Sequence, residues 1–362
     1  MRRQKLGERL TEIVGADGRL SRVLFDERAG LDHKTIINDH DFVCNMYRYL
    51  APVARRTLGH QNFGQGDTVI QFTAARQDRT FVDAGGVTVH FYQWKAAKPL
   101  GVVQVVHGLG DHALRYEQLA QKLVTAGYTV YADDHHGHGQ TGLGQWGGDY
   151  SKLGRLGEGG MRATVESVRE LSGIIRSENV GVPLVLLGHS WGSIIAQKII
   201  NAHSGEYEAL ILTGTAYRSF RRMNGGELNA RHKHLGTTGN EWLSRDPAVA
   251  QAFLDDPLTF SARALKLFGL VDSLRLLGRP ARNLARDLPV LIQIGSDDPF
   301  GGTESAELLA QSYLERSGLS DVELIVYTDA RHEIFNETNR EEVYADTVAW
   351  LKERLAKPGV KD

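Results

Sequence analysis

Short apolar runs alternate with amphipathic segments from about residue 81 onward, and this alternation constrains the fold more than any other feature. The apolar runs are Val102–Val106, Thr129–Ala132, Pro183–Leu187, Ala209–Leu212, Val290–Ile294 and Val322–Tyr327. Continuous runs of this kind are typical of strands that are buried on both faces. The segments with helical spacing are Tyr116–Ala126, Met161–Ile175, Ile194–Ala202, Ser305–Leu314 and Glu341–Leu355. Strands that alternate with helices predict an α/β fold with a mostly parallel central sheet flanked by helices.

One long segment interrupts this alternation. Residues 216–288 contain no strand-like run, and their apolar residues at helical spacing predict a helical insertion between two strands. The insertion carries 12 basic and 7 acidic side chains, a net charge of +5, whereas the whole chain carries −2. We therefore expect a core formed by residues 79–215 and 289–362, with the insertion as a helical cap, or lid.

The residues before the core, 1–78, form an N-terminal extension to which the sequence assigns no role. Four apolar residues of this extension lie near one helical face and predict a short helix: Phe42, Met46, Leu50 and Val53. Apolar residues on both sides of Gly85 and Gly86 then predict a β-hairpin at the start of the core.

Composition excludes several classes of protein. The net charge of −2 argues against a nucleic-acid-binding protein, which usually carries a strong basic excess. A single cysteine, Cys44, excludes internal disulfides and a cysteine-rich zinc site. No apolar run reaches the roughly 18 residues of a membrane span, and the basic start of the chain lacks the apolar region of a secretory signal. We expect a cytoplasmic protein, with peripheral membrane contact as a further possibility.

A G-x-S-x-G motif at Gly188–Gly192 marks a candidate nucleophile. A predicted buried strand, Val182–Leu187, comes directly before the motif, and a helical pattern, Ser193–Ile200, comes directly after it. A strand, a tight turn and a helix in this order expose a serine hydroxyl on a strained turn. The helix N-terminus also directs its partial positive charge at the reacting centre. Ser190 is therefore the predicted nucleophile.

A serine hydroxyl needs a base to become a good nucleophile, and an acid that orients this base. In folds with this serine turn, the acid and the histidine follow the serine along the chain. Asp297 and Asp298 follow the predicted strand Val290–Ile294 after Gly295 and Ser296. Asp298 fits the usual G-x-x-D spacing better, and Asp297 stays an alternative. His332 lies in the loop after the last predicted strand, where the base is expected.

Acyl transfer also needs backbone donors for the developing oxyanion. The N–H group of Trp191, which follows the nucleophile, is one expected donor, and the N–H group of Leu109, in the loop after the strand Val102–Val106, is the other. We further expect His107 and His189, which lie near these positions, to contact the substrate. Leu265 and Phe268 of the insertion are expected to contact it as part of an acyl channel.

Two histidine-rich stretches raise the alternative of a metal site. The first combines Asp133 and Asp134 with His135, His136 and His138, and the second is Arg231–His234. Such spacing can supply metal ligands. However, the first stretch falls in the turn after a strand, and the second is better explained as a solvated loop of the insertion. We therefore expect neither a metal nor a cofactor.

Taken together, the motifs resemble the monoglyceride-lipase and lysophospholipase-like branch of the α/β-hydrolase superfamily, with its serine aminopeptidase S33-like members. The resemblance covers about residues 80–357 and rests on His107–His112 with Arg115 and Tyr116, Asp134–Gly139, Gly188–Gly192, Trp242–Asp246, Asp256–Leu258, Gly295–Pro299 and Arg331–Glu333. It implies the α/β-hydrolase fold, a triad of Ser190, Asp298 and His332, and a cap at 216–288 over the site. Two positions depart from the pattern: His136, where the family more often has Arg, and Trp191, where Met is commoner.

The resemblance also implies a small-molecule ester substrate, either a monoacylglycerol or a lysophospholipid-type lipid. An esterase, lactonase or peptidase that acts on a small non-lipid substrate is one alternative, and a non-catalytic interaction protein is another, because this fold hosts many functions. The positive charge of the insertion suits an anionic head group or transient contact with an anionic membrane surface. No nucleic-acid partner is expected, and the sequence does not specify an oligomeric state.

Overall fold

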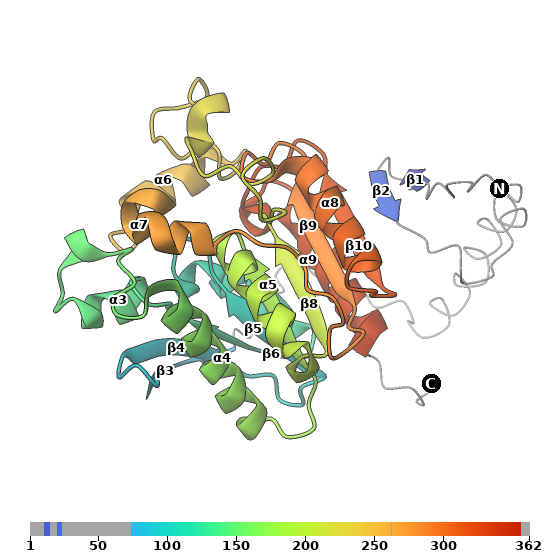
Figure 1. The fold of residues 1–362 in the computed structure, drawn as a ribbon, viewed down its shortest axis with the longest axis horizontal. Coiled ribbons are helices and arrows are strands. Elements are labelled where there is room, and N and C mark those ends of the chain that lie inside the picture. The colour runs from blue at the N-terminus through green and yellow to red at the C-terminus, as the bar shows by residue number, and fades with distance from the viewer. Residues whose placement is uncertain (1–10, 15–19, 24–73, 262, 356–362) are drawn as a thin grey trace, which may run out of the picture. The chain divides into compact units, whose positions relative to one another are not determined.

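The computed structural model describes residues 11–14, 20–23, 74–261 and 263–355 of the chain, and these form a sheet flanked by helices (Figure 1). Ten strands lie in the order β1-β2-β10-β9-β8-β7-β5-β6-β4-β3. Their bounds are Thr11–Val14 (β1), Leu20–Val23 (β2), Arg76–Val82 (β3), Thr88–Trp94 (β4), Gly101–Val106 (β5), Tyr128–Asp133 (β6), Leu184–His189 (β7), Ala209–Thr213 (β8), Val290–Gly295 (β9) and Val322–Tyr327 (β10).

The central strands are parallel, as the alternation predicts. Strand β5 pairs in parallel with β6 and β7, and the parallel ladder continues through β8 and β9 to β10. The antiparallel pairs lie toward the two edges of the sheet, where β3 pairs with β4, β4 with β6, β2 with β10 and β1 with β2. The predicted α/β-hydrolase fold class is confirmed, and each of the six apolar runs forms a strand within two residues of its expected bounds.

The helices cover both faces of the sheet, because successive side chains of a strand point to opposite faces. Leu184 and Leu186 of β7 belong to a core cluster with α4 and α5, whereas Val185 and Leu187 belong to a second cluster with α2 and α9. The helices of the core are Glu117–Thr125 (α2), Gly139–Gln145 (α3), Gly160–Glu178 (α4), Trp191–His203 (α5), Gly302–Glu315 (α8) and Arg340–Leu355 (α9). Helix α3 was not predicted, because its glycine-rich sequence GQTGLGQ lacks apolar spacing.

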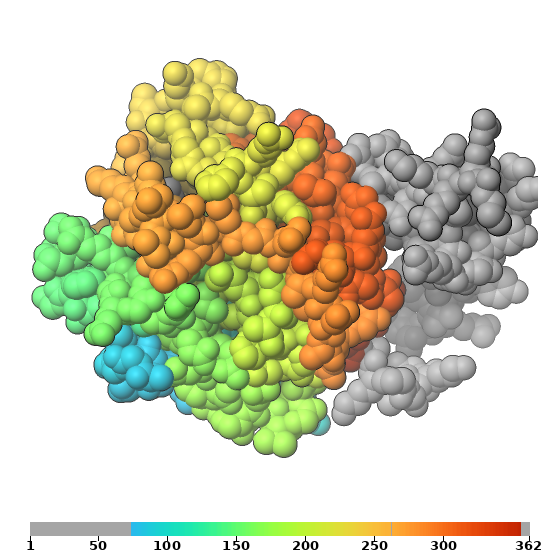
Figure 2. Space-filling view, viewed as in Figure 1, coloured from blue at the N-terminus to red at the C-terminus, as the bar shows by residue number. Residues whose placement is uncertain are grey.

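The described part of the segment between β8 and β9 contains two α-helices, Pro247–Asp255 (α6) and Ala264–Arg275 (α7), and a 3-10 turn at Leu228–Arg231. Among its described residues this segment forms no strand. Helix α7 is kinked at Gly269, whose φ of 69° and ψ of −178° interrupt the helical conformation. In Figure 2 the yellow atoms of the segment lie at the top of this face, and the orange atoms of α7 lie below them at the left.

The sheet extends into the expected N-terminal extension, because β1, β2 and the first residues of β3 all lie within residues 1–78. Strands β3 and β4 form the hairpin around Gly85 and Gly86, where Gly86 has a φ of 78°. The predicted helix with Phe42 and Val53 lies outside the described residues. Within the described part of the chain, none of the helices has the length and apolar character needed to cross a bilayer.

Candidate active site

The serine of the G-x-S-x-G motif sits on a strained turn between β7 and α5. Ser190 has a φ of 53° and a ψ of −122°, a backbone conformation that non-glycine residues rarely adopt. The flanking glycines are required by close backbone approach: a Cβ on Gly188 would lie 2.6 Å from the carbonyl oxygen of Gly192. A Cβ on Gly192 would lie 2.0 Å from the carbonyl oxygen of Val106 at the end of β5. The turn therefore holds the serine directly beside the loop that follows β5.

The loops after β9 and β10 bring a carboxylate and an imidazole together. His332 Nδ1 lies 2.9 Å from Asp298 Oδ1, and both side chains are almost completely buried. The Phe300 N–H group donates to the same carboxylate oxygen at 2.8 Å, which fixes its orientation. Among the described residues, His332 Nε2 has no hydrogen-bond partner. Nε2, the nitrogen that would act on a serine, is therefore available, while Nδ1 is held by Asp298.

Rings from three different segments surround His332. The centroid of its ring lies 4.8 Å from those of both His189 and Trp242, and 5.7 Å from that of Phe300. Because His189 immediately precedes Ser190, the imidazole lies next to the serine turn. The His332 N–H group also donates to the Trp242 carbonyl at 3.4 Å, so the insertion helps to hold the histidine loop.

The alternative acid, Asp297, faces the insertion instead of His332. His232 Nε2 lies 2.7 Å from one oxygen of this carboxylate, and Arg231 forms an ion pair with the other. The carboxylate in contact with His332 is therefore that of Asp298. The same contacts explain part of the Arg231–His234 stretch, since the buried His232 binds a carboxylate of the core.

Leu109 and Trp191, the two expected oxyanion donors, border the serine. Together with Ser190 they line a mainly apolar cavity of about 60 Å³. Neither backbone N–H group has a hydrogen-bond acceptor among the described residues. Backbone donors that converge on one point stabilise the charge that develops on a carbonyl oxygen during attack, and this is the role expected of these two groups.

His107 is not among the residues that line this cavity, and its expected contact with substrate stays a prediction. Its ring is buried, Nδ1 lies 2.8 Å from the Gly108 carbonyl oxygen, and Nε2 accepts a hydrogen bond from the His135 N–H group at 3.1 Å. Burial and the neighbouring rings of His135 and His138 hold the pKa of His107 well below its ordinary value. His107 is therefore neutral and positions the loop that carries Leu109.

The histidine-rich stretch after β6 is held by hydrogen bonds of this kind. His135 Nδ1 lies 2.7 Å from Asp133, and His136 Nε2 lies 2.6 Å from Asp83. Burial lowers the pKa of His138 to about 3, and its Nε2 accepts a hydrogen bond from the Gly110 N–H group at 3.3 Å. In the described parts of the chain, the side chains of His, Cys, Asp and Glu form no group of three or more that could hold a metal ion.

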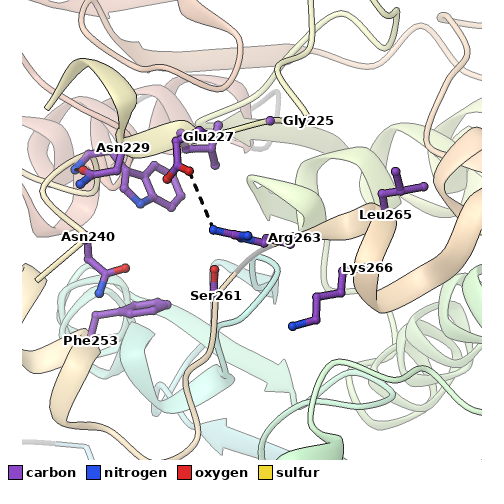
Figure 3. Close-up of a pocket in the computed structure, with 13 residues that line it drawn as sticks. Gly225, Glu227, Asn229, Asn240, Phe253, Ser261, Arg263, Leu265 and Lys266 are labelled. Carbon is purple, nitrogen blue, oxygen red and sulfur yellow. Dashed lines mark hydrogen bonds and ion pairs between the residues drawn. The ribbon is translucent and has the colours of Figure 1, made fainter. Parts of the chain in front are cut away.

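The other three expected substrate contacts fall in different places. His189 is buried, its Nδ1 lies 3.0 Å from Thr213 Oγ1, and burial followed by repulsion from His332 lowers its pKa to about 4. The Phe268 ring packs against the Trp191 ring at an interplanar angle of 38°, with centroids 5.2 Å apart. Leu265 is largely exposed and lines a larger pocket of about 470 Å³ (Figure 3). Of these three, only Leu265 is a wall residue of a pocket described here.

An ion-pair network that the sequence analysis missed connects the oxyanion loop to the histidine loop. Arg115 donates to both oxygens of Glu333, at 2.7 and 2.8 Å, and to Asp111 at 3.1 Å. Burial alone would lower the pKa of Arg115, but these two carboxylates raise it well above its ordinary value. Because Glu333 follows His332 and Asp111 follows Gly110, the guanidinium fixes both loops relative to each other.

A central parallel sheet, a serine on a strained turn after β7, an acid after β9 and a histidine after β10 are the features of an α/β-hydrolase. The family model described as serine aminopeptidase, S33 (Hydrolase_4), matches residues 97–339. The monoacylglycerol lipase of Mycolicibacterium smegmatis is 32% identical over 298 residues, which cover 78% of this chain and 99% of that protein. Human monoglyceride lipase is 28% identical over 293 residues, which cover 77% of this chain and 91% of that protein.

The structural comparison agrees with the sequence comparison. The crystal structure of a thermostable carboxyl esterase from Bacillus coagulans superposes with a TM-score of 0.66 at 26% identity and covers 78% of this chain and 100% of that chain. The chain therefore belongs to the serine aminopeptidase S33 family, in its monoglyceride-lipase-like branch, and it is a carboxylic ester hydrolase.

Proposed function

We propose that this enzyme hydrolyses esters of a single apolar acyl chain, such as monoacylglycerols or lysophospholipid-type lipids, through Ser190, His332 and Asp298. One observation carries the mechanism: Asp298 binds Nδ1 of His332, while Nε2 has no partner among the described residues and the ring lies beside the serine turn. An imidazole held in this way has its second nitrogen available for a serine proton.

In the proposed reaction, His332 Nε2 takes the proton of Ser190 Oγ as this oxygen attacks the ester carbonyl carbon. The carbonyl oxygen becomes an oxyanion and accepts hydrogen bonds from the Leu109 and Trp191 N–H groups, each of which contributes roughly 10²–10³ in rate. The carbon–oxygen bond to the alcohol then breaks, and His332 gives its proton to the leaving alcohol. A water attacks the acyl-enzyme by the same route and releases the carboxylic acid.

The substrate class is supported by the relatives and by the walls of the site. The two sequence relatives described above are named as lipases of monoacylglycerols. The cavity at Ser190 is lined mainly by apolar groups, including Ile194, Leu276 and Phe300. An apolar wall with few polar groups suits a hydrocarbon chain. Since residues of segment 216–288 line both pockets, we further propose that this segment is the cap of the enzyme.

The experiment is a chain-length series of p-nitrophenyl esters and 1-monoacylglycerols, measured with the wild type and with Ser190→Ala. We expect a maximum at medium or long chains and loss of hydrolysis in the variant. Ser177→Ala is the matched control, because Ser177 is an exposed serine of α4. Activity that survives Ser190→Ala would refute the mechanism.

A second candidate function is hydrolysis of short, soluble esters. The small volume of the cavity at Ser190, about 60 Å³, favours a short acyl group. The same series separates the two candidates, because a maximum at acetyl or butyryl esters, with no turnover of monoacylglycerols, would replace the lipid substrate while leaving the triad in place.

We also propose transient contact between the cap and a lipid surface. Helix α7 exposes Leu265, Leu270 and Val271, each by more than 60%. Exposed apolar side chains close together on one helix are typical of interaction sites. Co-sedimentation with phospholipid vesicles tests this contact, and equal sedimentation of wild type and Leu270→Ser would refute it.

A further inference from the structure

The larger pocket adjoins the cavity at the serine. Both cavities are lined by Gly225, Gly226, Leu228 and Trp242, so they adjoin at these four residues. The Trp242 ring also lies 4.8 Å from the ring of His332. Trp242 therefore borders both the serine cavity and the larger pocket.

The larger pocket differs from the serine cavity in its charged and polar walls. Arg263 and Lys266 supply two cations, and Glu227 supplies one anion. Ser261 and Asn240 add uncharged polar groups to the same walls. Figure 3 shows the side chains of Ser261, Arg263 and Lys266 on one side of the pocket, with Arg263 directed toward Glu227.

Neither cation is firmly held by the protein. The closest atoms of Arg263 and Glu227 are 3.8 Å apart, and both side chains are about two-thirds exposed. An exposed ion pair at this distance contributes little stability, so a ligand can displace the carboxylate from the guanidinium. The backbone N–H group of Lys266 donates to the Arg263 carbonyl, but its ammonium group has neither a hydrogen bond nor an ion pair with any described residue. The pocket thus offers two available cations next to a polar wall.

We propose that this pocket binds a phosphate group on the alcohol part of the substrate, so that the enzyme prefers anionic lysophospholipids to neutral monoacylglycerols. A guanidinium and an ammonium supply directed N–H donors to phosphate oxygens, and charge-assisted bonds of this kind are about twice as strong as neutral ones. This assignment rests on the proposed function, because it places the ester at Ser190. Glu227 opposes the binding of an anion, so its removal should change the substrate preference in the opposite direction to the removal of a cation.

The test compares kcat/KM for 1-lauroylglycerol 3-phosphate and 1-lauroylglycerol, and uses the ratio of the two values as the readout. We expect the wild-type ratio to exceed one. Lys266→Met should lower the ratio about five-fold, mainly through KM for the phosphate ester, because the phosphate group takes no part in the bonds that form and break. Glu227→Gln should raise the ratio, since it removes the competing carboxylate from Arg263.

Lys233→Met is the matched control, because Lys233 is an exposed lysine of the same segment that does not line the pocket. Its ratio should equal that of the wild type. A ratio that is unchanged in both Lys266→Met and Glu227→Gln would overturn the phosphate site, as would equal effects of Lys266→Met and Lys233→Met. Failure of the wild type to hydrolyse either ester would instead overturn the proposed function.

Discussion

Replacement of Gly192 by alanine should damage both the stability and the chemistry of this enzyme. The added Cβ would lie 2.0 Å from the Val106 carbonyl oxygen and 2.4 Å from that of His107. An ordinary van der Waals contact needs at least about 3.4 Å, so a backbone segment must move by more than 1 Å. Neither oxygen can rotate away, because both belong to the backbone at the end of β5. Overpacking of a close-packed interior typically costs 1–3 kcal/mol, and we expect at least about 3 kcal/mol here.

The same displacement should reach the oxyanion site. Val106 and His107 lead directly into Leu109, whose N–H group is a proposed donor, and Gly192 follows Trp191, which supplies the other. Loss of alignment of one donor costs roughly 10²–10³ in kcat. We therefore expect Gly192→Ala to lower kcat at least 100-fold, even in the fraction of molecules that remains folded.

Gly173→Ala is the matched control for this substitution. Gly173 lies inside α4, and apart from its neighbours in the helix no atom lies within 4 Å of the position of an added Cβ. Alanine is favoured over glycine in helices, so this variant should gain about 0.5–1 kcal/mol. Urea unfolding gives the two free energies, and steady-state hydrolysis of a p-nitrophenyl ester gives kcat. A Gly192→Ala enzyme with the stability and kcat of the wild type would refute the reasoning from close approach.

Three further predictions concern charged and titratable groups. Asp298→Asn should lower kcat roughly 10⁴-fold, because it disturbs the tautomer of the histidine, whereas Asp297→Asn should change kcat far less; equal losses in steady-state assays would contradict this assignment. Glu333→Ala should destabilise the fold by about 3–5 kcal/mol in urea unfolding, because it leaves the buried guanidinium of Arg115 without its main partner, and a cost below 1 kcal/mol would show that the pair is unimportant. Burial lowers the pKa of His189 in the folded protein to about 4, below its ordinary value of 6.5. The neutral side chain therefore contributes about 3 kcal/mol to the free energy of unfolding at pH 7, and this contribution is lost as the pH falls from 6.5 to 4. His189→Asn should flatten the curve of unfolding free energy against pH between pH 4 and 6.5, and an unchanged slope would argue against this role of His189.

The fold could be predicted from the sequence because its central strands are buried on both faces. Such strands appear as continuous apolar runs, and the order of runs and helical segments then determines where each loop emerges. His332 was found in this way, from its position after the last run. Helix α3 was missed because it packs through glycines and threonine and therefore has no apolar period.

Side-chain direction within a loop could not be predicted in the same way. Asp297 and Asp298 both follow β9, and their spacing from the strand differs by a single residue. The G-x-x-D spacing favours Asp298, and the packing then separates the two, because Asp297 contacts His232 of the insertion while Asp298 contacts His332. The pair of Arg115 and Glu333 was missed for a related reason: 218 residues separate the two, and no local pattern links them.

Much of the positive charge of the insertion is paired with carboxylates of the core, which its composition alone does not show. Four of its arginines form ion pairs with carboxylates outside the segment: Arg222 with Glu304, Arg231 with Asp297, Arg245 with Glu337 and Arg286 with Glu208. Much of the net charge of +5 is therefore balanced by acids of the core, and these contacts hold the insertion against the sheet. Because a balanced charge exerts little attraction beyond a Debye length of about 8–10 Å, composition alone does not support an anionic ligand. The support lies in Arg263 and Lys266, which are not bound to the core and which face a pocket beside the reacting serine.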